Sequence, residues 1–463
     1  MSCVFGMWHR VKKSNLPKIT IPVAFIALWC SWEFLHLNWQ ITWSWLNLGN
    51  IFAVHPTWVQ WYEYTGTFGG TIWILMVNFL IYGVIIAQRA TEYSQRATEK
   101  KTCVYLRHLC VNKIFLTLLA VIIIPLVISF IIYHTYKMKQ DVPVEAVVVQ
   151  QNIDPWKEQY SKSNLELAEL IIRTATSKLT SNTALIVCSE SALSHTISEE
   201  QLLNLNIYPH TSFQFFDKVF QQYPQLNMIF GLSTIAFFDS KVTPATRELY
   251  EGVFAELYNT SCLYNTDTIT LYRKSKLVPG VEKMPYPKIF GFLERLAIDL
   301  GGVNGSLGVD SEQRTFPATT DKGIVEIGAP ICYESIFGEL FSQFVKNGAQ
   351  LMCVITNDAW WGNTPGHKQH FEMSKLRAIE TRRYIMRAAN TGISAFIDPL
   401  GNEHQKTEYA TRTAITQTVY ANNEITFYTR YGDYLARIML GVAALVFLYI
   451  ICFSLFKVTK KLF

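Results

Sequence analysis

The sequence predicts an α/β layered domain combined with a transmembrane α-helical region of about four spans. The chain has 463 residues, 50% of them hydrophobic, which suffices for one large soluble domain and a membrane portion. Four long apolar segments indicate the membrane region. From Val144 onward, short runs rich in β-branched residues alternate with helical stretches, and this alternation is typical of layered α/β domains with both sheet faces covered.

Each of the four apolar segments is long enough to cross a hydrocarbon core, which takes about 20 mainly apolar residues. They are Ile19–Leu37, Gly66–Gln88, Ile114–Tyr133 and Ile438–Phe456. The last two contain no charged residue, and Pro125 is tolerated inside a membrane helix. The first carries Glu33 and His36, for which a structural role is favoured over a functional one.

Lysines and arginines indicate which ends of the spans face the cytoplasm. They gather in the amino-terminal tail, in the Arg89–Lys113 connection and in the carboxyl tail, and none lies between Lys18 and Arg89. The positive-inside rule therefore places Tyr136–Tyr434 on the outer side of the membrane. Since the first apolar stretch begins late and lacks a small-residue cleavage site, we expect an uncleaved anchor. The expected domains are a membrane region with three spans (1–135), an extracytoplasmic α/β domain (136–434), and a transmembrane helix with a basic tail (435–463).

Within the outer domain, hydrophobic periodicity separates strands from helices. The expected strands are Val144–Gln150, Ala184–Glu190, Asn227–Ile235, one or two within Ser261–Leu271, Ile324–Cys332, Leu351–Asn357 and Ile393–Asp398. The expected helices are Asn164–Leu179 and Lys368–Ala389. Residues Pro279–Arg314 contain six glycines and mixed charge, which indicates a long lid or substrate loop.

Three of these segments end in residues suited to nucleophilic catalysis. Glu190, Lys274 and Cys332 follow apolar runs in that order, and reactive groups of α/β sheets collect beyond strand ends. Each alone is a weak signal, whereas the order and flanking sequence together are specific. The nine cysteines are an odd number without a disulfide framework or metal-type spacing. Cys188 and Cys353 lie in apolar runs, where a buried inert thiol is favoured, and the same holds for Cys262.

Several motifs around these residues resemble the nitrilase, or carbon–nitrogen hydrolase, superfamily, and within it the apolipoprotein N-acyltransferase family. The matching pieces are Val149–Ile153, Ser189–Leu193, Tyr272–Pro279 followed by Glu282, Ile331–Glu334, Thr356–Gly362, Arg387–Gly392, Asn47–Asn50 and Thr65–Gly66. The likeness covers nearly the whole chain, and the lysine-to-Glu282 block is specific to the acyltransferases. It implies a nitrilase-like α-β-β-α sandwich with a Glu, Lys, Cys triad.

The sequence departs from the family pattern in two places. The family typically has eight spans, so an even number is missing here and the outer domain stays outside. The usual Leu-Val-Pro-Phe-Gly-Glu is replaced by Leu277–Glu282 with Gly280 and Val281, although Glu282 keeps its distance from Lys274.

The resemblance implies roles for the triad. Cys332 is the nucleophile, Glu190 the general base and later general acid, and Lys274 with the backbone N–H of Tyr333 stabilises the oxyanion. A thiol pKa is near 8.5 unperturbed, and we expect the neighbouring base and ammonium to increase the thiolate fraction. Cys332 then takes an acyl chain from a membrane phospholipid as a thioester. The α-amine of a lipoprotein's diacylglyceryl-cysteine accepts it, in ping-pong order.

Other residues are assigned supporting roles. Glu282 and Glu334 are expected to hold Lys274 and shape the cavity, and Glu334 could equally be a buried ion-pair partner. Trp156 matches a family tryptophan near the active site, with a core aromatic equally favoured. Five apolar residues are candidates for excluding water from the thioester, although ordinary packing explains each of them slightly better. They are Trp360, Trp361, Phe290, Phe292 and Leu293. For the series Lys375, Arg377, Arg382, Arg383 and Arg387, a solvated helix face is favoured over contacts with lipid phosphates.

Composition and spacing argue against other classes. The net charge of +5 comes from tails and loops, so nucleic acid is not an expected partner. His367 and His370 lack a third ligand at metal-type spacing, and we assign no metal and no cofactor. The resemblance implies a monomer in the bacterial inner membrane, with the bilayer as its surroundings. The alternatives are a membrane-tethered amidase with the same triad, or an inactive scaffold that has kept the fold.

Overall fold

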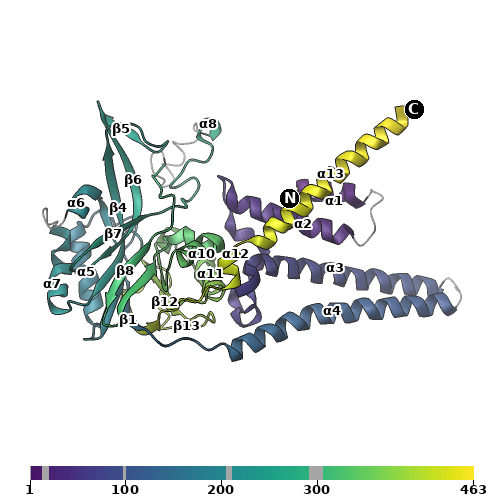
Figure 1. The fold of residues 1–463 in the computed structure, drawn as a ribbon, viewed down its shortest axis with the longest axis horizontal. Helices are drawn as coiled ribbons and strands as arrows, with labels where there is room; N and C mark the ends of the chain where they lie inside the picture. Colours follow the sequence, from purple (N-terminus) through teal and green to yellow (C-terminus); the bar gives the residue numbers. More distant parts are fainter. Residues whose placement is uncertain (1, 13–19, 97–100, 205–210, 291–305, 463) are drawn as a thin grey trace. The chain divides into compact units, whose positions relative to one another are not determined.

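A computed structural model describes the chain except residues 1, 13–19, 97–100, 205–210, 291–305 and 463 (Figure 1). Its contacts divide the chain into two compact units. The membrane unit comprises Met1–Trp39, Trp43–Tyr136 and Tyr431–Phe463. The catalytic unit comprises Gln40–Thr42 and Lys137–Arg430.

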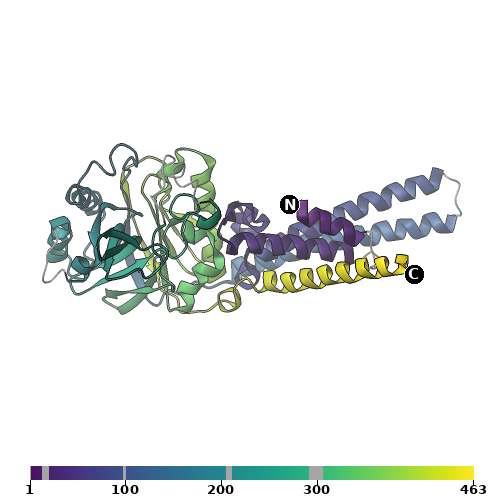
Figure 2. The same ribbon diagram turned by 90° about the horizontal axis from the view of Figure 1, so that it is seen from above.

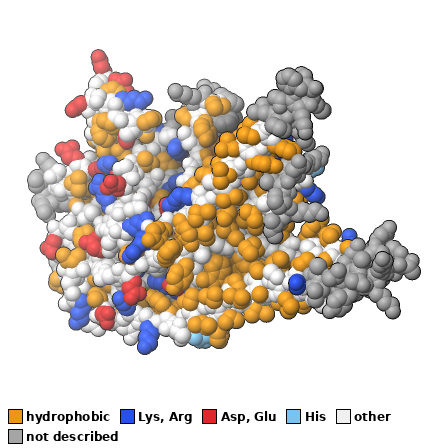
Figure 3. Space-filling model, turned by 45° about the vertical axis from the view of Figure 1, so that its right-hand side comes forward, with side chains coloured by type: hydrophobic (Ala, Val, Ile, Leu, Met, Phe, Trp, Pro, Cys, Tyr) orange, Lys and Arg blue, Asp and Glu red, His pale blue; other side chains and the backbone are white. Residues whose placement is uncertain are grey.

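The membrane unit is built from long apolar helices. They are α1 (Ser2–Lys12), α2 (Thr20–Asn38), α3 (Tyr62–Arg96), α4 (Lys101–Thr135) and α13 (Tyr434–Leu462), with 3-10 turns η1 (Ser44–Leu46), η2 (Leu48–Val54) and η3 (Pro56–Trp58) between α2 and α3. Among the described residues, four helices are long and apolar enough to cross a membrane, which agrees with the four expected spans. Hydrophobic side chains cover these helices in Figure 3, as lipid-facing surfaces require.

The catalytic unit contains two β-sheets. The eight-stranded sheet has the order β14-β1-β2-β4-β6-β5, with β3 on β4 and β7 on β6, and the six-stranded sheet has the order β13-β12-β11-β10-β9-β8. The first sheet consists of β1 (Pro143–Gln150), β2 (Thr183–Val187), β3 (Leu193–Ser198), β4 (Asn227–Phe238), β5 (Arg247–Tyr250), β6 (Val253–Tyr264), β7 (Ile269–Arg273) and β14 (Thr413–Tyr420). The second consists of β8 (Thr315–Thr320), β9 (Gly323–Gly328), β10 (Leu351–Thr356), β11 (Ile385–Ala389), β12 (Ala395–Ile397) and β13 (Glu403–His404).

Helices cover the outer faces of both sheets (Figures 1 and 2). The first sheet is covered by α5 (Asn164–Thr176), α6 (Glu199–Leu203) and α7 (Gln214–Gln222), and the second by α10 (Gly338–Lys346) and α11 (Pro365–Thr381). Shorter elements are η4 (Thr211–Phe213), α8 (Pro287–Phe290), η6 (Cys332–Ile336), η7 (Asp358–Trp361) and α12 (Phe427–Tyr431). The catalytic unit is therefore an α-β-β-α sandwich.

Strand β1 shows why the apolar runs form this sandwich. Val144, Ala146 and Val148 pack into the core between the sheets, whereas Val147 and Val149 pack into the core beneath α5 and α7. Successive side chains of a strand point to opposite faces, so both faces of β1 are buried. A strand buried on both faces needs a continuous apolar run rather than an alternating one.

In the outer domain, two expected elements differ most from their predicted ends. The helix expected at Lys368–Ala389 is α11 followed by β11, because Arg382 takes a left-handed conformation (φ 51°) at the helix end and the chain turns. The strand expected to reach Cys332 ends at Gly328. Of the expected loop Pro279–Arg314, residues 291–305, which include Phe292 and Leu293, lie outside the described residues, and the side chain of Phe290 is not described.

The prediction of a solvated basic helix face is wrong. Arg377, Arg382, Arg383 and Arg387 are each at most 2% exposed, and Lys375 is 8% exposed. Arg383, for example, donates from Nε to the carbonyl of Ala349 (2.9 Å) and from Nη1 to that of Glu424 (2.8 Å). The guanidinium fork satisfies buried carbonyls where the backbone leaves a sheet or helix, and periodicity alone does not reveal this use.

Candidate functional site

Glu190 lies in the turn after β2, which ends at Val187. The turn passes so close to β4 that a Cβ on Gly231 would lie 2.7 Å from the Cα of Glu190. Ser191 has a positive φ of 52°, which turns the chain away from the sheet. The Glu190 side chain is nearly buried, and its Oε2 accepts a hydrogen bond from the backbone N–H of Asn357 at 2.9 Å.

Lys274 follows β7 and is 1% exposed. Its Nζ lies 3.1 Å from Oε1 of Glu190 and 2.9 Å from Oε1 of Glu282. The amide of Asn259 on β6 donates to the same two oxygens, at 2.8 and 2.9 Å. A buried ammonium thus has two carboxylate partners, and the amide fixes the position of both carboxylates.

Cys332 opens the 3-10 turn η6 with a positive φ of 50° and is 8% exposed. A non-glycine residue in this region of φ is strained, and such strain clusters at active sites. The turn is held by Glu334, whose Oε2 accepts from the N–H of Ile331 at 2.8 Å. The other oxygen of Glu334 accepts from the N–H of Ser275 at 2.7 Å and from the hydroxyl of Tyr272 at 2.6 Å.

Glu334 therefore connects the Cys332 turn to the segment around Lys274. This carboxylate accepts hydrogen bonds from backbone N–H and hydroxyl groups, which favours this connecting role over a buried ion pair. Burial raises the pKa of Glu334 from its ordinary value, against the effect of these donors.

The charges around Cys332 do not favour a thiolate in the resting site. Burial raises the pKa of the Cys332 thiol well above its ordinary value, the charge of Glu190 raises it further, and Lys274 acts in the opposite direction. Burial alone would lower the pKa of Lys274, but Glu190 and Glu282 outweigh it and hold this pKa well above its ordinary value. The expected increase in thiolate fraction is therefore wrong for the resting site, where the thiol is neutral and the ammonium charged.

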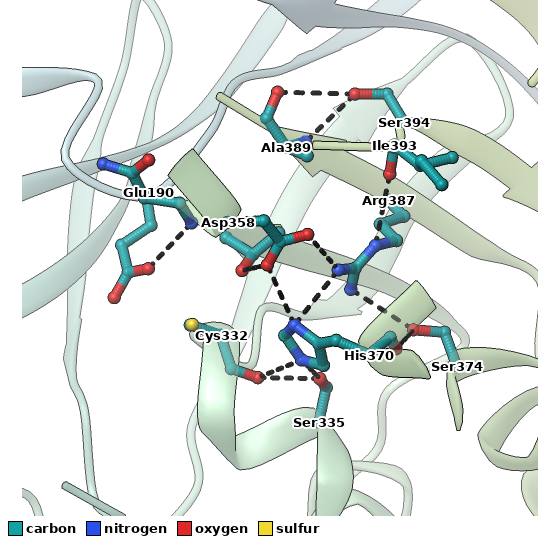
Figure 4. A network of polar contacts seen from close by, with 12 residues as sticks. Glu190, Cys332, Ser335, Asp358, His370, Ser374, Arg387, Ala389, Ile393 and Ser394 are labelled. Carbon is teal, nitrogen blue, oxygen red and sulfur yellow. Dashed lines mark hydrogen bonds and ion pairs between the residues drawn. The ribbon is translucent and has the colours of Figure 1, made fainter. Parts of the chain in front are cut away.

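A second polar network lies beneath the Cys332 turn (Figure 4). Nδ1 of His370, on α11, lies 2.9 Å from Oδ1 of Asp358, and its Nε2 lies 3.2 Å from the carbonyl oxygen of Cys332 and 2.9 Å from Oγ of Ser335. Arg387, on β11, donates to Oδ2 of Asp358 at 2.8 Å. Asp358, His370 and Arg387 are each at most 1% exposed.

The charge states of this network follow from its burial and its arginine. Arg387 and His370 outweigh the effect of burial and hold the pKa of Asp358 well below its ordinary value. Burial and the charge of Arg387 lower the pKa of His370. A neutral His370 beside a charged carboxylate carries its proton on Nδ1, which leaves Nε2 able only to accept. The Ser335 hydroxyl, which donates to the carbonyl oxygen of Cys332 at 2.7 Å, lies within hydrogen-bond distance of this Nε2.

Sequence reasoning missed this network. The sequence motifs assign no role to Asp358, they place Arg387 in a basic series interpreted as a solvated helix face, and they introduce His370 only as a possible metal ligand. Atoms of Cys332, Asp358 and His370 lie within 4.8 Å of one another. We assign no metal to them, because Asp358 and His370 already direct their polar atoms at neighbouring groups.

The tryptophans assigned to the site lie on two loops. Trp156 is 66% exposed, so the core-aromatic alternative is wrong, and its ring meets that of Trp360 edge to face at 5.0 Å. Trp361 meets the ring of His370 at 5.5 Å. Tyr333, beside Cys332, is 5% exposed, and its hydroxyl donates to the carbonyl oxygen of Thr42 at 3.1 Å.

Comparisons with known proteins agree with this architecture. A family model described as carbon-nitrogen hydrolase matches residues 146–420, and one described as the apolipoprotein N-acyltransferase N-terminal domain matches residues 1–80. The chain belongs to the carbon–nitrogen hydrolase family. Within it, the amino-terminal match and the relatives described next identify the apolipoprotein N-acyltransferase branch.

An apolipoprotein N-acyltransferase of Chlorobaculum tepidum is 27% identical over 452 residues, covering 94% of this chain and 78% of the relative. Another, of Geobacter metallireducens, is 25% identical over 448 residues, covering 95% of this chain and 76% of the relative. Among solved structures, Saccharomyces cerevisiae Nit3, a member of branch 10 of the nitrilase superfamily, covers 61% of this chain and 93% of its own, with a TM-score of 0.40 and 18% identity.

Proposed function

We propose that this chain moves a fatty acyl group from a membrane phospholipid, through a thioester on Cys332, to the amino-terminal α-amine of diacylglyceryl-cysteine in a lipoprotein. The observation that carries the proposal is the position of the Lys274 ammonium between the carboxylates of Glu190 and Glu282. The charges of Glu190 and Lys274 also act on the thiol of Cys332. The near-full-length similarity to proteins named apolipoprotein N-acyltransferase supports lipid and lipoprotein substrates.

In the first half-reaction, Glu190 takes the proton of the Cys332 thiol as the sulfur attacks the ester carbonyl carbon. Lys274 and the backbone N–H of Tyr333 stabilise the oxyanion. The carbon–oxygen bond then breaks, and Glu190 returns the proton to the departing alkoxide, which leaves as the hydroxyl of a lysophospholipid. Proton transfer during attack suits the neutral resting thiol, since charge forms only where Lys274 balances it.

In the second half-reaction, the neutral α-amine attacks the thioester carbonyl carbon. Glu190 accepts a proton from the amine, the carbon–sulfur bond breaks, and the thiolate is reprotonated as the amide forms. The products are the N-acylated lipoprotein and free Cys332, which gives ping-pong kinetics.

Surrounding residues complete the proposed site. Glu282 keeps Lys274 charged, and Glu334 holds the backbone of the Cys332 turn. Trp156, Trp360 and Trp361 are proposed to limit water near the thioester, because hydrolysis is the competing reaction.

We further propose a monomeric protein of the bacterial inner membrane with its catalytic domain on the periplasmic side. The distribution of lysine and arginine supports this orientation. The proposed organisation is a membrane region over 1–135, a catalytic domain over 136–434, and a transmembrane helix with a basic tail over 435–463.

A transfer assay tests the proposal. Purified protein is incubated with a phospholipid carrying a labelled acyl chain, with and without a diacylglyceryl-cysteine peptide. We expect labelled amide only when the peptide is present, loss of product in Cys332→Ala, and retention in Cys188→Ala, because Cys188 is fully buried in the core beneath α5 and α7. Free fatty acid at the same rate without peptide would favour the amidase-like hydrolase, and no product at all would favour the inactive scaffold.

A further inference from the structure

The membrane unit contains a small cavity at the end of α2. It has a volume of about 140 Å³. Its lining residues, all from α2 and the turns that follow, are Trp29, Trp32, Glu33, His36, Leu37, Trp43, Leu46 and Asn47. Three indole rings and two leucines make most of the wall apolar.

Glu33 is a structural anchor of this region, since its carboxylate already has three donors. Oε1 accepts from the indole N–H of Trp29 and the backbone N–H of Leu48, each at 2.9 Å, and Oε2 accepts from the hydroxyl of Thr71 at 2.8 Å. The carboxylate joins α2 to α3 and to the turn η2. This agrees with the structural role favoured from the sequence.

Asn47 and His36 leave polar atoms without partners beside the cavity. Asn47 is 7% exposed, and its Oδ1 accepts from the N–H of Gly49 at 2.9 Å, which fixes the amide orientation. Its Nδ2 is buried and has no hydrogen-bond partner among the described residues, and the same holds for Nδ1 of His36. A buried donor without an acceptor costs about 1–3 kcal/mol, so the Asn47 amide favours a ligand that accepts hydrogen bonds. Nδ1 of His36 can donate to the same ligand when it carries the ring proton.

The residues that line the cavity limit the chemical class of ligand that can bind there. A phosphate would place its charge next to the Glu33 carboxylate, and an ammonium would leave the Asn47 amide unpaired. A neutral acceptor flanked by hydrocarbon fits both the donors and the indoles. Tryptophan-rich belts lie at the depth of the lipid headgroups, next to the ester bonds of glycerolipids.

We propose that this cavity binds an acyl ester of a glycerolipid, with the ester carbonyl accepting from Asn47 and His36 and the first methylene groups against the tryptophans. The volume is close to that of a cavity that holds one benzene molecule, so it fits one ester with a few carbons rather than a whole lipid. The proposal draws on the proposed function only for the two sources of such an ester, a phospholipid or the diacylglyceryl group of a lipoprotein.

Photo-crosslinking tests the site in the full-length Cys332→Ala protein, which cannot form the acyl intermediate. The protein is placed in phosphatidylcholine nanodiscs with a phospholipid whose diazirine lies close to the ester, or with the diether analogue carrying the same diazirine. Mass spectrometry compares label on residues 29–47 with label on the lipid-facing span 111–135. We expect the ester probe to label 29–47 about fivefold more than the ether probe, the ratio that one hydrogen bond of about 1 kcal/mol gives.

Matched variants distinguish the loss of the proposed hydrogen bonds from misfolding of the protein. His36→Phe keeps the ring contacts with Trp32 (4.8 Å) and Trp39 (4.5 Å), and Asn47→Asp keeps the acceptor for Gly49. Both should abolish the ester preference, whereas His55→Phe, a histidine stacked on Trp58 outside the cavity, should not. Competition by unlabelled phospholipid against diacylglyceryl-cysteine peptide identifies the source.

Equal labelling by ester and ether probes, or an ester preference that survives both variants, would overturn the proposal. Because the Cys332→Ala protein lacks the nucleophile, that result would leave acyl transfer by the wild type untouched.

Discussion

The sulfur of Cys332 is surrounded by charges of both signs, and their balance decides when it becomes a nucleophile. Glu190 opposes ionisation of the resting thiol and Lys274 favours it. In the proposed mechanism, the same carboxylate that suppresses the thiolate at rest removes the proton during attack. This arrangement limits unwanted reactions of the thiol between turnovers.

The pH dependence of alkylation by iodoacetamide measures this balance directly. In the wild type, modification of Cys332 should rise only above pH about 8.5, the ordinary thiol pKa. Glu190→Gln removes a charge that raises the thiol pKa, so its profile should shift to lower pH, and Lys274→Met should shift it to higher pH. Acyl transfer should nevertheless fall by about 10²–10⁴ in Glu190→Gln, because the general base is lost. If the alkylation profile of Glu190→Gln is unchanged or shifts to higher pH, the charge of Glu190 does not oppose ionisation of the Cys332 thiol.

His370 contacts the Cys332 turn from below through Ser335, whose hydroxyl lies 2.9 Å from Nε2 of His370 and 2.7 Å from the carbonyl oxygen of Cys332. His370→Phe keeps the ring against Trp361 but removes both nitrogens, so we expect kcat to fall about 10- to 100-fold with KM unchanged, and His370→Gln to recover part of the loss. His367→Phe on the same helix is the control, since the ring of His367 packs against that of Tyr409 at 4.6 Å. Equal losses in the two phenylalanine variants would point to packing alone.

At this scale, the sequence indicated the triad candidates but not their surroundings. Glu190, Lys274 and Cys332 stand out because reactive groups follow strands in a recognisable order. Asn259 and His370 come from the middle of a strand and a helix, where a polar residue has no pattern of its own. Their roles depend on which carbonyl or carboxylate lies opposite, and only the tertiary structure supplies that.

The elements of the sandwich explain why the triad turns lie where they do. The positions of Glu190, Cys332 and Asp358 depend on turns after, or close contacts with, four strands: β2, β4, β9 and β10. The apolar runs predicted these strands well, because a strand buried on both faces has few alternatives. The end of α11 was misplaced, since the arginines that follow it satisfy buried carbonyls instead of facing water.

Because β4 lies in close contact with the Glu190 turn, a side-chain carbon added at this contact should displace the turn. Gly231→Ala places a Cβ 2.6 Å from the N of Ser191, so the turn must move. We expect a loss of about 1–3 kcal/mol in unfolding free energy, as for other overpacked sites, and at least a tenfold loss of transfer. Gly366→Ala, where the nearest atom lies at an ordinary 3.5 Å, should leave both unchanged. Normal activity in Gly231→Ala, measured beside chemical denaturation, would show that the turn tolerates displacement.

At the scale of the whole molecule, four apolar helices and a sandwich unit form a membrane-associated protein. The spans could be predicted because crossing a bilayer demands length and apolarity, both of which are local properties. The side on which the sandwich lies is a prediction from lysine and arginine placement.

Cysteine labelling in intact cells with a permeabilised outer membrane tests that orientation. Lys241→Cys in the catalytic unit should react with an impermeant maleimide, and Glu92→Cys near the end of α3 should react only after lysis, with both sites read by peptide mass spectrometry. Both positions are exposed. The reverse pattern would place the catalytic unit in the cytoplasm.

An acyl group on the sulfur of Cys332 is the species on which the proposed enzymology depends. The most direct measurement is peptide mass spectrometry of the purified protein after incubation with a phospholipid carrying a labelled acyl chain, without acceptor. The predicted result is one acyl adduct on the peptide containing Cys332, released by hydroxylamine, discharged by a diacylglyceryl-cysteine peptide and absent in Cys332→Ala. An unmodified Cys332 in a preparation that still forms the labelled amide, or a hydroxylamine-resistant adduct elsewhere, would contradict it.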